Sequence, residues 1–276
     1  MIRVFPRRTK WTPDDELAFV GDPPLFRPQG RTVYISVTFT WDISEASRLY
    51  CAWNQFYPDV FVGGPAWANH PGEFDPGKFL KEGVTITSRG CPWKCPWCFV
   101  PKREGGIKEL EIKDGWIVQD NNLLACSKEH QEKVFKMLLR QRDRIEFAGG
   151  LDGHFLSTWH IDWFKKLRVR QFWFACDHSD SFKRLEKISD LMADFPERKK
   201  RCYVMIGYDG ESIRDAETRL EKVYSMGFLP FSQLYQGEKW IEYPKEWKKL
   251  NRKWSRPAAY RKAPEGGRGG TKSECR

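Results

Sequence analysis

The sequence lacks the long apolar runs of membrane and secreted proteins. Its 276 residues contain no uninterrupted stretch of the roughly 18 to 20 apolar residues that a membrane-spanning helix needs. Its first ten residues, MIRVFPRRTK, contain no apolar segment typical of a secretory signal peptide. We therefore expect a cytoplasmic protein without membrane contact.

A disulfide framework is also missing. Of the eight cysteines, three are clustered and five are scattered along the chain, at Cys51, Cys126, Cys176, Cys202 and Cys275. A small secreted domain would instead distribute its cysteines as pairs that staple the fold. A pool of reduced thiols in the cytosol fits this distribution better.

What the chain does contain is enough apolar material for a sizeable core. Its residues are 40% hydrophobic and 15% aromatic, which excludes an intrinsically disordered protein. The length suits one α/β barrel of about six to eight units with an attached piece.

The net charge of +10 is concentrated at the carboxyl end. Positions 245–276 contain eleven Lys or Arg against three Glu, so +8 of the +10 lies in these 32 residues. One interpretation is a tail that binds nucleic-acid phosphates. The other is a solvated, flexible end, because APEGGRGGTKSECR is rich in Gly, Pro and charge.

Strand-like and helix-like stretches alternate after position 80. Helix starts are predicted at the caps Ser127, Thr158 and Ser212, and Gly227 is a predicted helix stop. This alternation favours an α/β fold with a parallel sheet, either doubly wound or a partly closed barrel, whose strand ends meet at one rim. Six strands are expected, at 83–88, 116–122, 144–150, 169–177, 201–207 and 228–235.

The first 80 residues predict one βαβ unit, packed against the sheet or continuing it. Its strands are expected at 32–42 and 59–67, with Ser44 near the cap of the helix between them. The GGP of the second strand lacks the G-x-G-x-x-G spacing of a dinucleotide site. The expected organisation is an N-terminal extension (1–80), a barrel (81–240), and a basic C-terminal helix with a flexible tail (241–276).

The stretch GCPWKCPWCFVPKREG places Cys91, Cys95 and Cys98 within eight residues. A structural zinc site needs four ligands, which Cys126 and His130 could complete. Buried core cysteines are a poor explanation, because the intervening prolines fix a loop. A 4Fe-4S cluster held by three thiolates, with one iron open, fits best.

The C-x-x-x-C-x-x-C motif after the first strand, TSRGCPWKCPWC, resembles the signature of radical S-adenosylmethionine enzymes. It is most similar to their methylthiotransferase and cobalamin-associated branches. The resemblance covers about residues 83–236 and implies a partial (β/α)6 barrel. Cys91, Cys95 and Cys98 would ligate three irons, and S-adenosylmethionine would chelate the fourth. Reductive cleavage, with electrons from a donor such as flavodoxin or ferredoxin, would then give a 5′-deoxyadenosyl radical that abstracts hydrogen from a substrate.

The resemblance also implies further cofactor contacts, each of which has a purely structural alternative. Trp97 would lie beside adenine. The methionyl amine would be bound by Asp120, Asn121 and Asn122, for which Gly149 and Gly150 are a rival pair. The strand-five element that packs along adenine would contain Ile206, Gly207, Gly210 and Glu211. Candidate catalytic or substrate-side residues at strand ends are Asp152, His154, Cys176, Asp177, His178, Gln233 and Tyr235.

This sequence lacks several features of the two branches that it resembles, and their absence narrows the set of expected activities. Only Cys51 precedes the motif, so a methylthiotransferase's second cluster is not expected. An Asp-x-His-x-x-Gly loop is missing, so bound cobalamin is not expected either. No later cysteine pair has ferredoxin-like spacing, which argues against auxiliary clusters.

Two substrate classes remain. A nucleotide or nucleic acid would use the basic tail and the tryptophans of WKKLNRKW, Trp247 and Trp254, although these with Leu250 also resemble a helix core face. A small metabolite or peptide would need only the barrel mouth. The non-enzyme alternative is a zinc-stabilised nucleic-acid-binding module.

Overall fold

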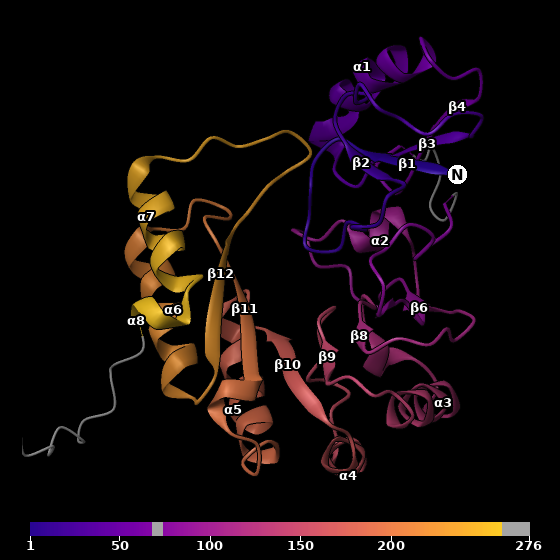
Figure 1. The fold of residues 1–276 in the computed structure, drawn as a ribbon. Helices are drawn as coiled ribbons and strands as arrows, with labels where there is room; N and C mark the ends of the chain where they lie inside the picture. Colours follow the sequence, from indigo (N-terminus) through magenta and orange to yellow (C-terminus); the bar gives the residue numbers. More distant parts are fainter. Residues whose placement is uncertain (68–73, 261–276) are drawn as a thin grey trace, which may run out of the picture.

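The computed structural model describes residues 1–67 and 74–260. Its larger sheet has six parallel strands whose order in space equals their order in the sequence. This confirms the predicted parallel α/β fold, and the unreversed order excludes the doubly wound alternative. The strands are β5 (Val84–Thr85), β8 (Ile117–Val118), β9 (Ile145–Phe147), β10 (Val169–Ala175), β11 (Lys200–Ile206) and β12 (Leu229–Leu234) (Figure 1).

The first predicted strand, 83–88, is wrong as one element. Its start forms β5, and its end forms β6 (Ser88–Arg89), which pairs antiparallel with β7 (Lys108–Glu109). The chain leaves the main sheet at Thr87, because the backbone N–H and the hydroxyl of this residue both donate to Asp120.

Four helices return the chain between these strands and pack against one face of the sheet. They are α3 (Lys128–Leu139), α4 (Thr158–Lys166), α5 (Phe182–Leu191) and α6 (Ile213–Ser225). Ser127 and Ser212 cap α3 and α6 as predicted, and Gly227 follows α6 at φ 79°. The predicted cap Thr158 is wrong by one residue, because Ser157 forms a capping box with His160.

Alternate side chains of the strands point to opposite faces of the larger sheet, and those on the helix side form the core. Phe172 and Phe174 of β10 are fully buried on the helix side. Trp173, between them, points to the other face and stacks on Tyr203 of β11 with ring centroids 4.3 Å apart. The sheet is therefore apolar on both faces, which suits strands covered on both sides.

The N-terminal residues form a second parallel sheet of their own. Its strand order is β2 (Ala18–Val20), β1 (Ile2–Phe5), β3 (Val33–Ser36) and β4 (Val60–Gly63). The predicted βαβ unit is present as β3, α1 (Ile43–Asn54) and β4, but β1 and β2 were not predicted, and the unit does not continue the larger sheet. Ser44 lies inside the first turn of α1, because a 3-10 turn ending at Asp42 precedes it.

Polar contacts join the two sheets. Lys10 Nζ lies 2.9 Å from Glu146 Oε1 of β9, and Thr40 Oγ1 donates to the Glu238 carbonyl after β12 at 2.9 Å. The N-terminal unit therefore contacts the interior strand β9 and the segment that follows the edge strand β12.

The C-terminal helices α7 (Lys245–Trp254) and α8 (Pro257–Tyr260) pack on the larger sheet. Leu250 and Trp254 are buried in its core, and Trp247 is half-buried against it. The core-face interpretation of these tryptophans is therefore confirmed, and Trp254 is not available for base stacking. The predicted flexible segment 263–276, with Cys275, lies outside the described residues.

The remaining elements are short. They are α2 (Val100–Arg103) and 3-10 turns at Thr40–Asp42, Leu123–Ala125, Ser179–Ser181 and Glu197–Lys199. None of the helices in the described ranges is long and apolar enough to cross a membrane.

The buried His160 links the starts of two helices. Its Nδ1 accepts from the Ser157 N–H at 3.1 Å, and its Nε2 lies 2.8 Å from Gln131 Oε1 on α3. The ring is therefore neutral with its proton on Nε2. Burial lowers the pKa of His160 from 6.5 to about 4.

We expect this histidine to make stability depend on pH. As the pH falls from about 6.5 to 4, the unfolded imidazole takes up a proton before the buried one does, so folding loses stability in this window. Between about pH 7 and 5 the loss should be about 1 to 2 kcal/mol, measured by urea unfolding. His160→Gln should flatten this part of the profile, and an unchanged pH dependence would contradict the assignment.

Candidate metal and cofactor site

The three clustered cysteines occupy a tight loop between β6 and α2. The loop closes on itself, because Cys91 N donates to the Gly105 carbonyl at 3.1 Å. It is also held to the end of β8, because Gly90 N donates to Asn121 Oδ1 at 3.0 Å. Gly90 has φ 85°, and a Cβ there would lie 2.0 Å from the Gly106 carbonyl oxygen. Only glycine fits this position.

The thiols of Cys91, Cys95 and Cys98 are free and half-buried. Burial raises the pKa of both Cys95 and Cys98, and the neighbouring thiols raise both further. Within the described residues, no three His, Cys, Asp or Glu side chains are already placed around one point as a ligand set for a metal ion. The chemistry of the donors, three thiols in one loop, suits an iron–sulfur cluster.

Cys126 and His130, the other possible zinc ligands, contact groups outside the cysteine loop, although the buried Nε2 of His130 has no hydrogen-bond partner in the described part of the chain. Cys126 is buried and hydrogen bonds with Ser88 and the Asn122 carbonyl. His130 Nδ1 lies 3.7 Å from Glu109 Oε2. Neither is placed with the cysteine loop as a fourth ligand.

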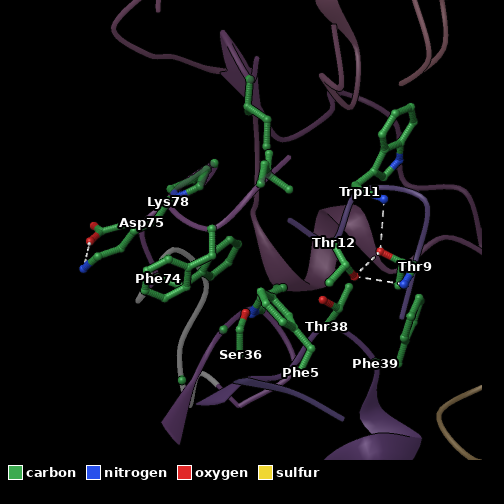
Figure 2. Close-up of a pocket in the computed structure, with 18 of the residues that line it drawn as sticks. Phe5, Thr9, Trp11, Thr12, Ser36, Thr38, Phe39, Phe74, Asp75 and Lys78 are labelled. Atoms are coloured by element: carbon green, nitrogen blue, oxygen red, sulfur yellow. Dashed lines mark hydrogen bonds and ion pairs between the residues drawn. The ribbon is translucent and has the colours of Figure 1, made fainter. Parts of the chain in front are cut away.

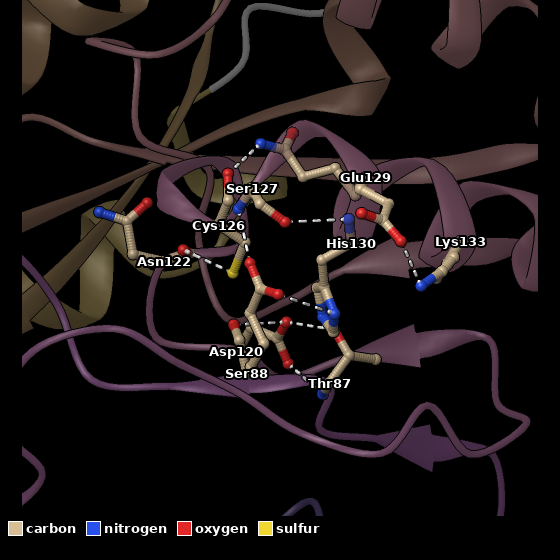
Figure 3. A network of polar contacts seen from close by, with 11 residues as sticks. Thr87, Ser88, Asp120, Asn122, Cys126, Ser127, Glu129, His130 and Lys133 are labelled. Atoms are coloured by element: carbon tan, nitrogen blue, oxygen red, sulfur yellow. Dashed lines mark hydrogen bonds and ion pairs between the residues drawn. The ribbon is translucent and has the colours of Figure 1, made fainter.

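Asp120 anchors the start of the cysteine loop. Its carboxylate accepts from Thr87 N and Thr87 Oγ1, each at 2.6 Å, and from Ser88 Oγ at 2.9 Å (Figure 3). Burial raises the pKa of Asp120, and these hydrogen bonds oppose the rise. The carboxylate predicted to bind the methionyl amine is thus occupied by the segment that leads into the cysteines.

Asn122, two residues later, has an unused acceptor beside the loop. Its Nδ2 lies 3.5 Å from Cys91 Sγ and donates to Asp152 Oδ2 at 2.9 Å. Its Oδ1 is buried and has no hydrogen-bond partner among the described residues. A buried acceptor without a partner costs about 1 to 3 kcal/mol, and a bound ligand that donated a hydrogen bond to it would remove this cost.

Asp152, at the end of β9, organises one side of the rim. Its carboxylate accepts from Asn122, from Trp93 Nε1 in the cysteine loop at 2.5 Å, and from the N–H of His154 at 3.0 Å. The His154 ring packs at a tilt against Trp93, with centroids 4.5 Å apart, and contacts Arg184 of α5. Arg184 was not predicted, because nothing in its local sequence distinguishes it from a solvated helix residue.

Trp97 anchors the other side of the loop. It hydrogen bonds with Asp177, whose Oδ1 also accepts from Met205 N at 3.0 Å, and burial raises the pKa of that carboxyl. The Trp97 ring packs edge-on to Tyr208 at 5.7 Å, and Tyr208 packs edge-on to Tyr235 at 4.8 Å. Through Trp93 and Trp97 the loop therefore contacts residues that follow β9, β10 and β11.

The glycine turn after β11 is closed by its own side chains. Glu211 accepts from Gly207 N at 2.9 Å and pairs with Arg219 at 2.7 Å. The hydroxyl of Tyr243, which was not predicted, lies 3.1 Å from the Gly207 carbonyl. Glu211 thus stabilises the turn, and the backbone of Ile206 and Gly207 lies at the carboxyl end of β11.

Four other predicted residues lie apart from the cysteine loop. Cys176 is fully buried in the core, where burial raises the pKa of its thiol to about 12. His178 is exposed and its Nδ1 lies 3.2 Å from Asp180 Oδ2. Gln233 and Gly210 are exposed.

A cavity of about 510 Å³ lies between the two sheets (Figure 2). It is at the carboxyl ends of β1 and β3, where the order of the N-terminal sheet reverses, and such switch points commonly bind ligands. Its far wall contains Arg89, Asn121 and Gly149, next to the cysteine loop. Aromatic rings form much of the rest, from Trp11, Tyr34, Phe39, Phe61, Phe74 and Phe79.

The cationic side chains of this cavity are neutralised. Arg7 pairs with Asp42, Lys78 with Asp75, and Arg89 with Glu104. Gln119 Oε1 is a buried acceptor without a partner in the described ranges. The cavity therefore suits an uncharged ring that can donate a hydrogen bond, and not a phosphate group.

Gly90→Ala should disrupt the cysteine loop. The new methyl group would clash with the backbone at Gly106, whereas at Gly105, which has φ 75°, nothing lies within 4 Å of a Cβ. Gly105→Ala should therefore cost about 1 kcal/mol of backbone strain. We expect Gly90→Ala to cost clearly more in urea unfolding and to impair iron uptake. Equal behaviour of the two variants would contradict the tight turn.

Comparison with protein-family models found no match, and a search of curated proteins found no relative.

Proposed function

We propose that this chain is a radical S-adenosylmethionine enzyme built on a partial (β/α)6 barrel. The observation that carries the proposal is the partnerless Asn122 Oδ1 beside Cys91, at the rim where the three thiols lie. The sequential order of the six strands supports the partial barrel, because consecutive parallel strands are what such a barrel contains.

Cys91, Cys95 and Cys98 would hold three irons of a 4Fe-4S cluster. The cluster and S-adenosylmethionine would together supply a 5′-deoxyadenosyl radical that abstracts hydrogen from the substrate. A flavodoxin or ferredoxin would be the electron donor, in the cytoplasm.

Asn122 would bind the methionyl amine. Its Nδ2 donates to Asp152, and this fixes the amide so that Oδ1 is the atom left to accept from the cofactor. Asp152 is therefore a positioning residue, and so is Asp120, which fixes the segment leading into the cysteines. An ammonium group offers the charge-assisted donor that this acceptor lacks.

Trp97 and the backbone of Ile206 and Gly207 would line the adenine. Trp97 is held by Asp177, and Tyr208 packs on its edge. These groups lie at the ends of β10 and β11, so the nucleoside would extend along the rim away from Asn122.

The cavity favours a substrate with an uncharged ring, such as the base of a nucleotide. Its aromatic walls can stack on a planar group, and about 510 Å³ falls within the usual range of small-molecule sites. A small metabolite or a peptide side chain is the alternative occupant.

Product analysis tests the proposal. Protein purified without oxygen and loaded with iron and sulfide is reduced with dithionite in the presence of S-adenosylmethionine, and 5′-deoxyadenosine is measured by mass spectrometry. The proposal predicts its formation. Bound zinc, a colourless protein and no nucleoside would replace it with the zinc-stabilised nucleic-acid-binding module.

A further inference from the structure

A second recess of about 530 Å³ lies at the amino-terminal ends of the strands of the larger sheet, whereas the cysteine loop lies at their carboxyl ends. We call it the basic cleft. Five of its seven lining residues are cationic, namely Arg144, Arg168, Arg170, Arg198 and Lys199, and the other two are Val169 and Gln171.

The parallel register of the sheet assembles this charge. Arg144 directly precedes β9, Arg168 and Arg170 flank the first residue of β10, and Arg198 and Lys199 lie in the 3-10 turn before β11. Val169 pairs with Ile145, and Phe172 pairs with Lys200, so the three strand starts lie side by side. Three segments distant in sequence thus place their cations at one edge.

These cations differ from those of the cavity. None of the five forms an ion pair within the described part of the chain, and no carboxylate lines the recess. The four arginines are exposed and Lys199 is half-buried. Like charges so close together repel one another, and an anionic ligand would remove that repulsion.

The composition of the basic cleft identifies the anion. Four of the five cations are guanidinium groups, whose planar forks match phosphate oxygens. No aromatic or exposed apolar side chain lines the recess, so it offers nothing for base stacking, for insertion into a membrane or for an apolar protein contact. The charges extend over three strands spaced about 4.8 Å apart, a row that suits successive phosphates better than a single one.

We propose that the basic cleft binds the phosphodiester backbone of a nucleic acid. This binding does not rest on the radical chemistry, because the cysteine loop lies at the other edge of the sheet. If the nucleotide substrate proposed above is part of a nucleic acid, the basic cleft would anchor its flanking strand.

Fluorescence anisotropy of the full chain with a labelled single-stranded DNA tests the proposal without cluster or S-adenosylmethionine. Arg168→Gln/Arg170→Gln removes two exposed charges from the cleft. We expect binding about tenfold weaker, and the slope of log affinity against log salt to fall by about 1.4, since each phosphate contact on a single strand contributes about 0.7.

The matched control is Lys133→Gln/Lys136→Gln on α3, which removes the same charge from a surface where each lysine pairs with a glutamate. It should bind as the wild type does. Unchanged binding by the arginine variant, or equal weakening by both, would overturn the proposal. Tripolyphosphate competing as well as DNA at equal phosphate concentration would overturn it in favour of a free oligophosphate. Urea unfolding of both variants should match the wild type, because all four positions are exposed or surface-paired.

Discussion

Cys95→Ala protein, loaded with iron and sulfide without oxygen, should hold almost no iron, whereas the wild type should hold about four irons per chain. In the proposed site Cys95 would be the middle of three ligands, and the two remaining thiols would not retain a cluster that has no fourth protein ligand. Formation of 5′-deoxyadenosine should fall to the background rate. Iron and sulfide analysis with the visible spectrum measures the loss.

Cys126→Ala is the matched control for this result. Cys126 is a buried cysteine close in sequence whose contacts are Ser88 and the Asn122 carbonyl. It should keep the iron content of the wild type. If Cys126→Ala and Cys95→Ala both lost metal, and the metal were zinc, a four-ligand structural site would replace the cluster.

Asn122→Ala should separate cofactor binding from cluster assembly. The variant removes the proposed acceptor for the methionyl amine and leaves all three thiols, so iron content should be unchanged. We expect S-adenosylmethionine to bind about 10- to 100-fold more weakly, the cost of one charge-assisted hydrogen bond in a buried site. Equilibrium dialysis of the loaded protein with labelled cofactor measures this.

Asn121→Ala provides the contrast. Asn121 Oδ1 accepts a hydrogen bond from Gly90 N and so supports the cysteine loop, whereas Asn122 is the residue beside Cys91. It should reduce iron loading and, in the fraction that loads, leave cofactor affinity near the wild-type value. Asn122→Ala protein that bound the cofactor as tightly as the wild type would contradict the assigned amine contact.

The larger sheet could be predicted because its signals are local. Strands such as 201–207 contain an apolar run, and the helices between them begin at caps such as Ser127 and Ser212. The strands β1 and β2 could not be predicted, because they are four and three residues long and are stabilised by pairing with distant neighbours.

In the candidate site, too, local patterns could be predicted and contacts made in the folded chain could not. The cysteine spacing is a local pattern and was visible in the sequence. The partners of Asp120 and Glu211 were not visible. Thr87 lies 33 residues from Asp120, and no pattern in the sequence marks Arg219, eight residues after Glu211 in α6, as its partner. Both acids resemble ligand-binding residues at strand ends, and only the folded chain shows that their oxygens are occupied.

The basic cleft was also invisible in the sequence. Its five cations lie in three segments, and none of these segments is a run of charge like the carboxyl end. The run of charge in the sequence lies in the tail, whereas strand register concentrates other cations at the start of β9, β10 and β11.

Electron paramagnetic resonance tests most directly whether a 4Fe-4S cluster on the cysteine loop binds S-adenosylmethionine. The spectrum of the iron-loaded, dithionite-reduced protein is recorded with and without S-adenosylmethionine. We expect a signal of a reduced 4Fe-4S cluster that changes when the cofactor is added, because in the proposed site the cofactor would bind the iron that no protein side chain ligates. A cluster signal unaffected by saturating cofactor, or a protein that holds zinc and gives no signal, would contradict it.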